Sequence, residues 1–330
     1  MKEILIAGGA GYIGSHMCKY LAQHNMRPVV VDNLSSGHRE AVQWGPFYEG
    51  DIADADLLRK VFTQHNIEAV MHFAAFCYVG ESVEKPLKYY QNNIAATLTL
   101  LSEMLAHDVF KFIFSSTCAT YGEPATLPIL EDFPQQPINP YGRSKQMMEQ
   151  ILDDLDRGQQ MKAVCLRYFN AAGADPEGQI GEDHRPETHL IPLVLQTALG
   201  QREEITIFGD DYPTDDGTCV RDYIHVVDLA QAHYLSLLHL LDGGQSRKYN
   251  LGNGNGYSIL EVIDATRSVT GAAIPLRYGE RRPGDPAALV GSSALITEEL
   301  NWQPQHHRLE EIIQTAWRWH KENPDGFKED

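Results

Sequence analysis

A tyrosine and a lysine four residues apart are the side chains in this sequence best suited to moving a proton. Tyr141 and Lys145 follow Asn139-Pro140 at the start of a predicted helix, so their spacing places them on one helix face. A phenol with an ordinary pKa of about 10 acts as a base near neutral pH only if its phenolate is favoured by about 4 kcal/mol. A neighbouring ammonium group and a cationic nicotinamide would both supply that preference. Taken alone, the pair also fits two exposed residues of an ordinary surface helix.

Three hydroxyl side chains, Ser115, Ser116 and Thr117, follow the predicted strand Phe110–Phe114. In an open parallel sheet, ligands bind beyond the carboxyl ends of the strands, so we expect these hydroxyls to face a site. Thr117 would then pass a hydrogen bond to a substrate hydroxyl. The alternative is that these residues cap the next helix.

Three glycines directly follow the first predicted strand, Ile4–Ala7, and precede helical sequence. Gly8, Gly11 and Gly14 form a GxxGxxG pattern rather than GxGxxG. Glycine permits a tight turn, lets main-chain amides approach a pyrophosphate, and places it at the positive end of a helix. A flexible turn without a ligand is the alternative for the motif in isolation.

An acidic residue ends the second predicted strand, Pro28–Val31, where a dinucleotide-binding unit places the carboxylate that bonds the adenosine ribose. Asp32 would repel the extra phosphate of NADP, so the pattern favours NAD, although a helix cap or turn residue is the alternative. Asp51 follows Phe47–Gly50, and we expect it near the adenine.

The elements that must position these residues alternate between short apolar runs and amphipathic stretches. This order predicts right-handed βαβ crossovers and an α/β fold with a doubly wound parallel sheet of the Rossmann type. The remaining predicted strands are 69–75 and 163–168, and the predicted helices are 12–24, 55–65, 89–107 and 141–157.

The composition of the sequence changes after Asn170, where Gly, Pro and charged residues become frequent. We expect an NAD-binding domain at 1–175 and a smaller α/β substrate-binding lobe at 176–330. Parts of 221–254 could return to the first sheet, because Asp228–Leu241 is a predicted helix and Lys248–Leu251 a predicted strand.

Composition excludes several classes of protein. The 330 residues are 43% hydrophobic and carry a formal charge of -18, which argues against disorder and against nucleic acid as a partner. No apolar run is long enough to cross a bilayer, so we expect no membrane association. Five cysteines without a CxxC pair favour a reducing, cytoplasmic location. His184 and His189 lie near acidic residues, but no HExxH or EF-hand spacing occurs, so we expect no metal.

Together the glycine turn, the hydroxyl run and the tyrosine–lysine pair resemble the extended short-chain dehydrogenase/reductase family. The rest of the chain, from Lys2 to about Asn323, is similar to the UDP-hexose epimerases of that family. This second resemblance rests on the motifs RYFN (167–170), GEDHRPE (181–187), FGDDYPT (208–214), GTCVRDYIHV (217–226) and RRPGD (281–285).

The resemblance implies interconversion of UDP-galactose and UDP-glucose by an enzyme that keeps NAD bound. Hydride would leave the sugar C4, the 4-keto sugar would rotate, and hydride would return to its other face. Tyr141 would be the base, Lys145 would lower its pKa and hold the nicotinamide ribose, and Thr117 would bond the reacting oxygen. A homodimer joined through the helices at 89–107 and 141–157 is also implied, although packing on the sheet explains their apolar faces equally well.

The resemblance also assigns ligand-binding residues by position. The NAD-binding set is Gly8, Gly11, Tyr12, Ile13, Gly14, Asp32, Asn33, Asp51, Ile52, Phe73, Ala74, Asn92, Ser115, Tyr141, Lys145 and Tyr168. The UDP-sugar set is Thr117, Tyr141, Asn170, His189, Phe208, Arg221, Arg282, Asp285 and Leu289, in which the two arginines suit the diphosphate.

Three positions depart from the family's usual residues. Thr117 stands where serine is frequent, Cys77 where some relatives have a lysine near the cofactor, and Leu289 where an aromatic residue tends to exclude N-acetylated sugars. Leu289 therefore favours some activity on UDP-N-acetylglucosamine and UDP-N-acetylgalactosamine, and Cys77 puts one cofactor contact in doubt.

Three other functions compete. Sugar-nucleotide dehydratases and decarboxylases share the tyrosine and lysine but place acidic residues just after the threonine, where this chain has Cys118-Ala119-Thr120. An NADP-dependent reductase is disfavoured by Asp32. A catalytically silent NAD sensor would not need to keep Tyr141 and Lys145 together.

Overall fold

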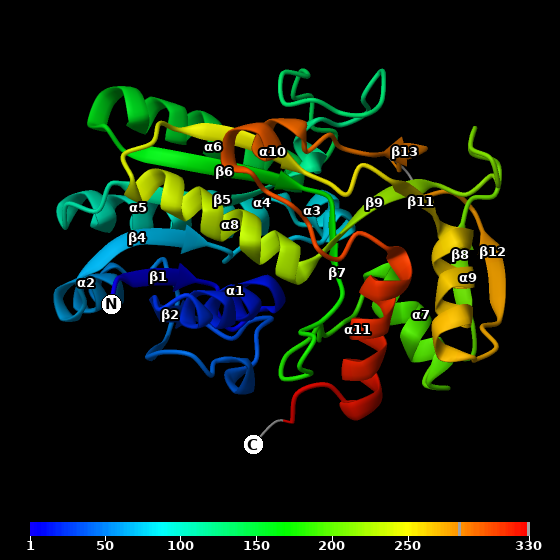
Figure 1. Ribbon diagram of the computed structural model, residues 1–330. Coiled ribbons are helices and arrows are strands. Elements are labelled where there is room, and N and C mark those ends of the chain that lie inside the picture. The colour runs from blue at the N-terminus through cyan, green and yellow to red at the C-terminus, as the bar shows by residue number, and fades with distance from the viewer. Residues whose placement is uncertain (283–284, 329–330) are drawn as a thin grey trace.

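The computed structural model describes residues 1–282 and 285–328, and its centre is a seven-stranded, all-parallel sheet (Figure 1). The strand order is β10-β6-β5-β4-β1-β2-β3, which confirms the predicted α/β fold with a doubly wound sheet. The strands are β1 (Glu3–Ala7), β2 (Arg27–Asp32), β3 (Phe47–Glu49), β4 (Ile67–His72), β5 (Lys111–Thr117), β6 (Lys162–Tyr168) and β10 (Arg247–Leu251).

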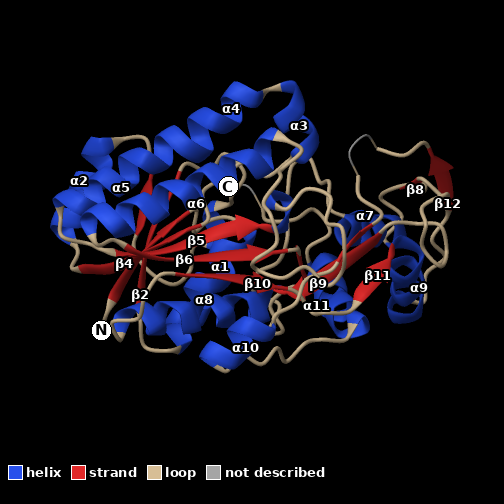
Figure 2. Cartoon of the chain, turned by 90° about the horizontal axis from the view of Figure 1, so that it is seen from above, coloured by secondary structure: helices blue, strands red, loops and turns tan. Residues whose placement is uncertain are grey.

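Helices cover both faces of this sheet because its strands are apolar on both sides. In β1, Ile4 and Ile6 face one cluster of buried side chains, whereas Leu5 and Ala7 face the other. The first face is covered by α1 (Tyr12–Gln23), α8 (Val226–Leu241) and α10 (Ala294–Leu300), and the second by α2 (Ala55–Gln64), α5 (Thr97–Ala106) and α6 (Pro140–Gln159) (Figure 2).

The remaining elements form a smaller α/β unit beside the carboxyl ends of the large sheet (Figures 1 and 2). One sheet orders its strands β11-β9-β13 with β7 also paired to β9, and a second pairs β12 with β8. These strands are β7 (Asn170–Ala172), β8 (Ile205–Phe208), β9 (Val220–His225), β11 (Gly256–Ser258), β12 (Leu276–Gly279) and β13 (Ala288–Leu289). Their helices are α7 (Leu190–Ala198), α9 (Ile259–Thr270) and α11 (Leu309–Glu322).

The two units are joined by more than one crossing of the chain. After passing through β8 and β9, the chain returns as α8 and then as β10, which pairs in parallel with β6. The two units therefore interleave in the sequence. Among the described helices, none is both long and apolar enough to cross a membrane.

Several element boundaries differ from those predicted. Strand β4 begins and ends earlier than the predicted 69–75, because the backbone leaves the sheet after His72. The predicted helix 89–107 is three consecutive segments: α4 (Pro86–Tyr90), a π-helical turn η2 (Gln91–Ala96) and α5. Within the first 160 residues, the short elements that were not predicted are α3 (Val79–Glu84) and the 3₁₀ turns η1 (Arg39–Ala41) and η3 (Cys118–Thr120).

Candidate active site

In the glycine turn between β1 and α1, the main chain at Gly14 packs closely against the main chain at Gly8. Gly8 adopts φ +84°, a conformation that side chains disfavour. A Cβ on Gly14 would lie 2.1 Å from the carbonyl oxygen of Gly8. Gly11 is the N-cap of α1. Only glycine therefore fits at Gly14, and the amino end of α1 is held where a pyrophosphate would meet its free amides.

Asp32, the last residue of β2, anchors two loops of this region. One carboxylate oxygen accepts a hydrogen bond from the Ala10 amide at 2.9 Å, and the other accepts one from the Leu34 amide at 2.8 Å. Burial raises the pKa of Asp32, whereas these two amides favour its charged form. Each carboxylate oxygen has a second lone pair, so a ribose hydroxyl could still be bound.

A pocket opens between the glycine turn and the ends of β2, β3 and β4. It is lined by nine residues of the predicted cofactor set, namely Gly8, Gly11, Asp32, Asn33, Asp51, Ile52, Phe73, Ala74 and Asn92. Asn33 and Asp51 bond to each other at 2.9 Å. The pocket has the position and the small-residue lining that a dinucleotide needs.

The pocket also has lining residues outside the predicted set. Gly37 also lines it, and a Cβ there would lie 2.7 Å from the main chain of Ala10. The run of small residues around Gly37 is the sequence signal that could have indicated this contact. Tyr12 and Ile13 are not among the lining residues: the Tyr12 hydroxyl donates to the Gly173 carbonyl at 2.6 Å, and Ile13 packs against the core.

Lys145 is a buried cation in α6 that reaches the end of β5. Its Nζ donates a hydrogen bond to the carbonyl oxygen of Ser115 at 2.7 Å and lies 4.8 Å from the centre of the Phe114 ring. Burial lowers the pKa of Lys145 to about 8, and the charge of Glu149 partly offsets this effect. The structure therefore places a buried amine at the carboxyl edge of the sheet.

Tyr141 lies in α6 one helical turn before Lys145, and Thr117 is the last residue of β5. Burial raises the pKa of Tyr141 well above its usual value, whereas the Thr117 side chain favours the phenolate. The predicted lowering of this pKa is not met in the protein alone, because desolvation of the phenolate outweighs the effect of Thr117. A cationic ring beside the phenol would oppose that desolvation.

Ser115 connects β5 to a histidine that contacts two further rings. Its hydroxyl lies 3.2 Å from His233 Nε2, and the His233 ring centre lies 6.2 Å from that of Tyr168, the last residue of β6. The Phe73 ring contacts the same histidine, with ring centres 4.9 Å apart. The predicted cofactor residues Phe73, Ser115 and Tyr168 thus form one connected group.

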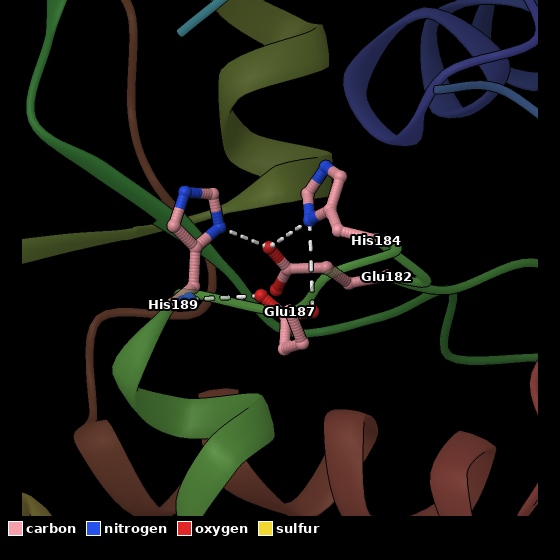
Figure 3. Close-up of side chains that lie close together, drawn as sticks. All are labelled: Glu182, His184, Glu187 and His189. Carbon is pink, nitrogen blue, oxygen red and sulfur yellow. Dashed lines mark hydrogen bonds and ion pairs between the residues drawn. The ribbon is translucent and has the colours of Figure 1, made fainter. Parts of the chain in front are cut away.

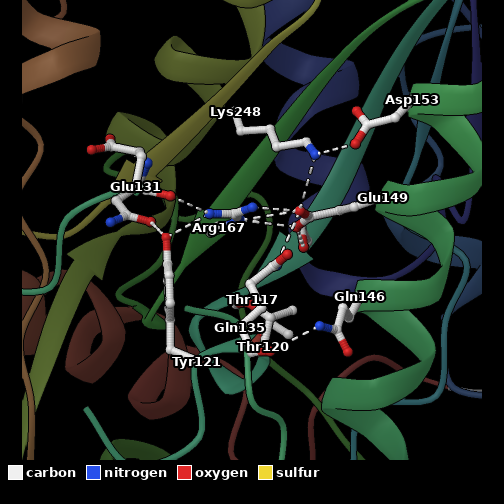
Figure 4. A network of polar contacts seen from close by, with 12 residues as sticks. Thr117, Thr120, Tyr121, Glu131, Gln135, Gln146, Glu149, Asp153, Arg167 and Lys248 are labelled. Atoms are coloured by element: carbon white, nitrogen blue, oxygen red, sulfur yellow. Dashed lines mark hydrogen bonds and ion pairs between the residues drawn. The ribbon is translucent and has the colours of Figure 1, made fainter. Parts of the chain in front are cut away.

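A buried ion pair supports the back of this site (Figure 4). Glu149, one turn after Lys145, is fully buried and accepts hydrogen bonds from the Arg167 guanidinium at 2.6 and 3.0 Å. The Ser116 hydroxyl donates to the same carboxylate at 2.5 Å, and Arg167 also donates to the Tyr121 hydroxyl at 2.7 Å. This network ties α6 to β5 and β6, and Glu149 had no predicted role.

Predicted substrate residues come from the smaller unit. Arg221 in β9 forms an ion pair with Asp285, and the Arg282 guanidinium stacks 4.1 Å from the Phe208 ring centre. Each arginine is thus held beside its predicted neighbour. Residues 283–284 of the RRPGD motif lie outside the described residues.

Two further predicted residues flank Arg221. Asn170 in β7 donates a hydrogen bond to the Asp222 carbonyl at 2.9 Å. Leu289 in β13 is the register partner of Arg221 and packs against the buried cluster of Tyr121, Ile129 and Phe169.

His189 sits in a different setting from the other predicted substrate residues. Its Nδ1 bonds the buried carboxylate of Glu182, and His184 and Glu187 complete a compact cluster (Figure 3). Both histidines have raised pKa values, that of His184 to about 11, because the carboxylates outweigh burial. The same contacts lower the pKa of Glu182 to about 2.

This arrangement of a glycine turn, a strand-end aspartate and a tyrosine–lysine pair on a parallel sheet defines a dinucleotide-binding enzyme that moves protons and hydride at a carbinol carbon. Comparison with family models then matches residues 4–252 to the NAD dependent epimerase/dehydratase family. The chain belongs to this family, and the pocket fits its cofactor, NAD.

Individual relatives extend the similarity to nearly the whole chain. The UDP-glucose 4-epimerase of Halalkalibacterium halodurans is 55% identical over 324 residues, 98% of this chain and 97% of the relative. A crystal structure of UDP-glucose 4-epimerase superimposes with a TM-score of 0.97 and 54% identity, covering 99% and 100% of the two chains. The Bifidobacterium longum UDP-glucose 4-epimerase, crystallised with NAD⁺ and UDP, superimposes with a TM-score of 0.94 and is 40% identical. The match covers 99% of this chain and 100% of that structure's chain.

Proposed function

We propose that this protein interconverts UDP-galactose and UDP-glucose as an NAD-dependent 4-epimerase. The observation that carries the proposal is the placement of Tyr141 one turn before the buried amine of Lys145, which bonds the Ser115 carbonyl at the sheet edge next to the dinucleotide pocket. The UDP-glucose 4-epimerases that match nearly the full length of the chain support the same activity.

The reaction assigns a task to each of these side chains. NAD, when bound, would supply the hydride acceptor for the sugar C4 and then the hydride donor for the opposite face. Tyr141 takes the proton of the C4 hydroxyl and later gives it back, while Thr117 bonds the same oxygen. Lys145 is fixed by the Ser115 carbonyl and supplies positive charge near the phenol. Both sugar faces must present C4 at similar geometry, so the hexose is held loosely.

The UDP moiety is held by the smaller unit. We assign the diphosphate to Arg221 and Arg282, because forked guanidinium donors match phosphate oxygens. Asn170, Phe208, Asp285 and His189 contribute to the nucleotide and its ribose. Asp285 holds Arg221 in place until a ligand arrives, and the stacking on Phe208 does the same for Arg282. The division into an NAD-binding domain at 1–175 and a UDP-sugar-binding domain at 176–330, with parts of 221–254 returning to the first sheet, belongs to this proposal.

A second substrate class follows from Leu289. This residue presents an aliphatic side chain beside Arg221, and an aromatic ring there would fill more of the space next to the sugar. We therefore propose turnover of UDP-N-acetylglucosamine and UDP-N-acetylgalactosamine as well. Detection of neither activity, beside rapid turnover of UDP-galactose, would contradict this extension.

Assembly and location complete the proposal. The outer faces of α5 and α6 expose Leu98 and Met147, which suits the expected homodimer interface. The five cysteines are all free thiols, which supports a reducing cytoplasm.

The decisive experiment needs no added cofactor. Purified protein is incubated with UDP-galactose, and the products are separated by chromatography. We expect UDP-glucose to appear until equilibrium is reached. Unchanged substrate in a protein saturated with NAD would favour the silent sensor, whereas a 4-keto-6-deoxy sugar nucleotide would identify a dehydratase.

A further inference from the structure

We propose that Glu182, His184, Glu187 and His189 form a binding site for one divalent transition-metal ion, with Zn²⁺ as the best match. Each residue offers one ligand atom, and the four atoms all lie within 4.8 Å of one another (Figure 3). Two imidazoles and two carboxylates are a ligand set that Zn²⁺ accepts in proteins. The inference goes beyond the proposed activity and departs from our expectation that the protein binds no metal.

The distances inside the cluster fit a tetrahedron around such an ion. Metal–ligand bonds of about 2.0–2.1 Å place neighbouring ligand atoms of a tetrahedron about 3.3 Å apart. His184 Nδ1 lies 3.4 Å from Glu182 Oε1 and 3.6 Å from Glu187 Oε2. These separations are longer than good hydrogen bonds and close to the spacing expected between two ligand atoms of a tetrahedral site. The shorter His189–Glu182 contact would have to open by rotation of the exposed His189 ring.

One donor atom of the cluster lacks a satisfactory protein partner. His184 Nδ1 is buried and makes no hydrogen bond of good geometry within the described residues. The ring is fixed by edge contacts to Tyr12 and Tyr78, with centres 6.3 and 6.4 Å away. Because both carboxylates lie beyond good hydrogen-bond distance of this buried nitrogen, an ion between the three groups would give it a closer partner.

The Glu187 carboxylate is oriented so that one of its oxygens faces the proposed position of the ion. Glu187 Oε1 accepts the amides of Thr188 and His189 at 2.7 and 2.8 Å, which leaves Oε2 toward His184. The carboxylates keep protons on both imidazoles, and a divalent cation would take the place of these protons when it binds.

The bound ion would fix the conformation of the loop between β7 and α7. Three ligands come from the loop between β7 and α7, and the fourth is the N-cap of α7. A metal would therefore cross-link the loop to the helix that begins the smaller unit. This role is positional and requires no chemistry at the metal.

The test measures metal uptake directly on the full-length, tag-free chain with NAD bound. After dialysis against a chelator, the protein is titrated with Co²⁺ while its visible absorption is recorded, and Zn²⁺ content is measured by mass spectrometry. We expect one ion per chain and the intense absorption of tetrahedral Co²⁺. His184→Gln and Glu187→Gln should each weaken Co²⁺ binding by at least about 100-fold, since even an outer contact is worth about 10- to 100-fold.

A matched control uses a histidine–glutamate pair outside the cluster. His65 Nδ1 lies 3.1 Å from Glu3 Oε1, so His65→Gln removes a similar contact and should leave Co²⁺ binding unchanged. Should a cluster variant fail to fold, crystals of the unsubstituted protein soaked in Zn²⁺ give the answer by anomalous scattering. No stoichiometric uptake, an anomalous peak elsewhere, or equal binding by well-folded cluster variants would overturn the site without bearing on the epimerase activity.

Discussion

The Nζ atom of Lys145 donates a 2.7 Å hydrogen bond to the carbonyl oxygen of Ser115, so helix α6 is joined directly to the end of strand β5. The amine is buried at the carboxyl edge of the large sheet. This single contact explains how a lysine that is costly to bury is nevertheless held in one place.

Substitution of the proposed base should abolish most of the activity without loss of binding. Tyr141→Phe keeps the ring but removes the phenol hydroxyl. We expect the turnover of UDP-galactose to fall by about 10²- to 10⁴-fold, the usual contribution of a general acid–base group. UDP affinity, measured by calorimetry, should stay within a factor of a few. Turnover near the wild-type rate would remove Tyr141 from its assigned role.

Asp32 should determine both the affinity for NAD and the rejection of NADP. Asp32→Asn removes the charge that anchors the Ala10 and Leu34 amides and would accept the ribose hydroxyls. A lost charged hydrogen bond of about 1.5–3 kcal/mol predicts NAD binding weaker by about 10- to 100-fold, with a smaller preference over NADP. Titration calorimetry on NAD-depleted protein measures both constants.

The control for this experiment is Asp56→Asn, in an exposed ion pair on α2. It should leave NAD binding unchanged. If Asp32→Asn also bound NAD with wild-type affinity, the carboxylate would have only a structural role in the turn.

Lys145→Met should stabilise the protein while inactivating it. Burial lowers the pKa of Lys145 from 10.5 to about 8, so below pH 8 the charged amine destabilises the folded wild-type protein by about 3 kcal/mol. The variant escapes this penalty but loses the hydrogen bond to Ser115, which is worth about 1 kcal/mol. The unfolded chain holds this proton more tightly, so wild-type stability from this group rises between about pH 8 and 10.5.

The difference between the two proteins therefore depends on pH in a defined direction. Urea unfolding should show the variant more stable by about 2 kcal/mol at pH 7, with the advantage shrinking toward pH 10. An advantage that grew with pH, or a variant less stable at pH 7, would disagree with a buried and destabilising amine.

Removal of the buried carboxylate beneath the site should be costly. Glu149→Gln leaves the Arg167 guanidinium buried without its charge partner (Figure 4), which predicts a loss of about 3–5 kcal/mol in the free energy of unfolding. Asp154→Asn breaks an exposed ion pair on the same helix and should cost less than about 1 kcal/mol. Equal urea midpoints for the two variants would show that Glu149 contributes little.

The proposed dimer interface makes a prediction about size. Leu98→Arg together with Met147→Arg places charges on the exposed faces of α5 and α6 and should convert a dimer into a monomer of 37.0 kDa. Tyr278→Arg, at an equally exposed aromatic residue of β12, should leave the dimer intact. Light scattering measures all three proteins, and a wild-type monomer would refute the assembly.

The sequence predicted those parts of the site in which spacing along the chain fixes position in space. The glycine turn, Asp32 and the pair Tyr141 and Lys145 each lie within one βα unit or one helix turn, so local geometry determines their arrangement. Strand–helix alternation predicted the sheet for the same reason, since a βαβ crossover permits little else.

Contacts that depend on long-range packing could not be predicted in this way. Glu149 meets Arg167 only because α6 crosses β6, and neither residue's spacing reveals the pair. The raised pKa of Tyr141 depends on how completely the neighbouring chain excludes water. The cluster around Glu182 follows no standard ligand spacing, so a search for familiar metal motifs passed over it.

The return of β10 to the edge of the large sheet limits how the protein could be re-engineered. A chain truncated before the smaller unit would leave β6 as a bare edge and would lose the cover that α8 provides. Exchange of the substrate-specific half with that of a related enzyme therefore requires transplanting separate, non-contiguous stretches rather than joining two halves at a single splice point.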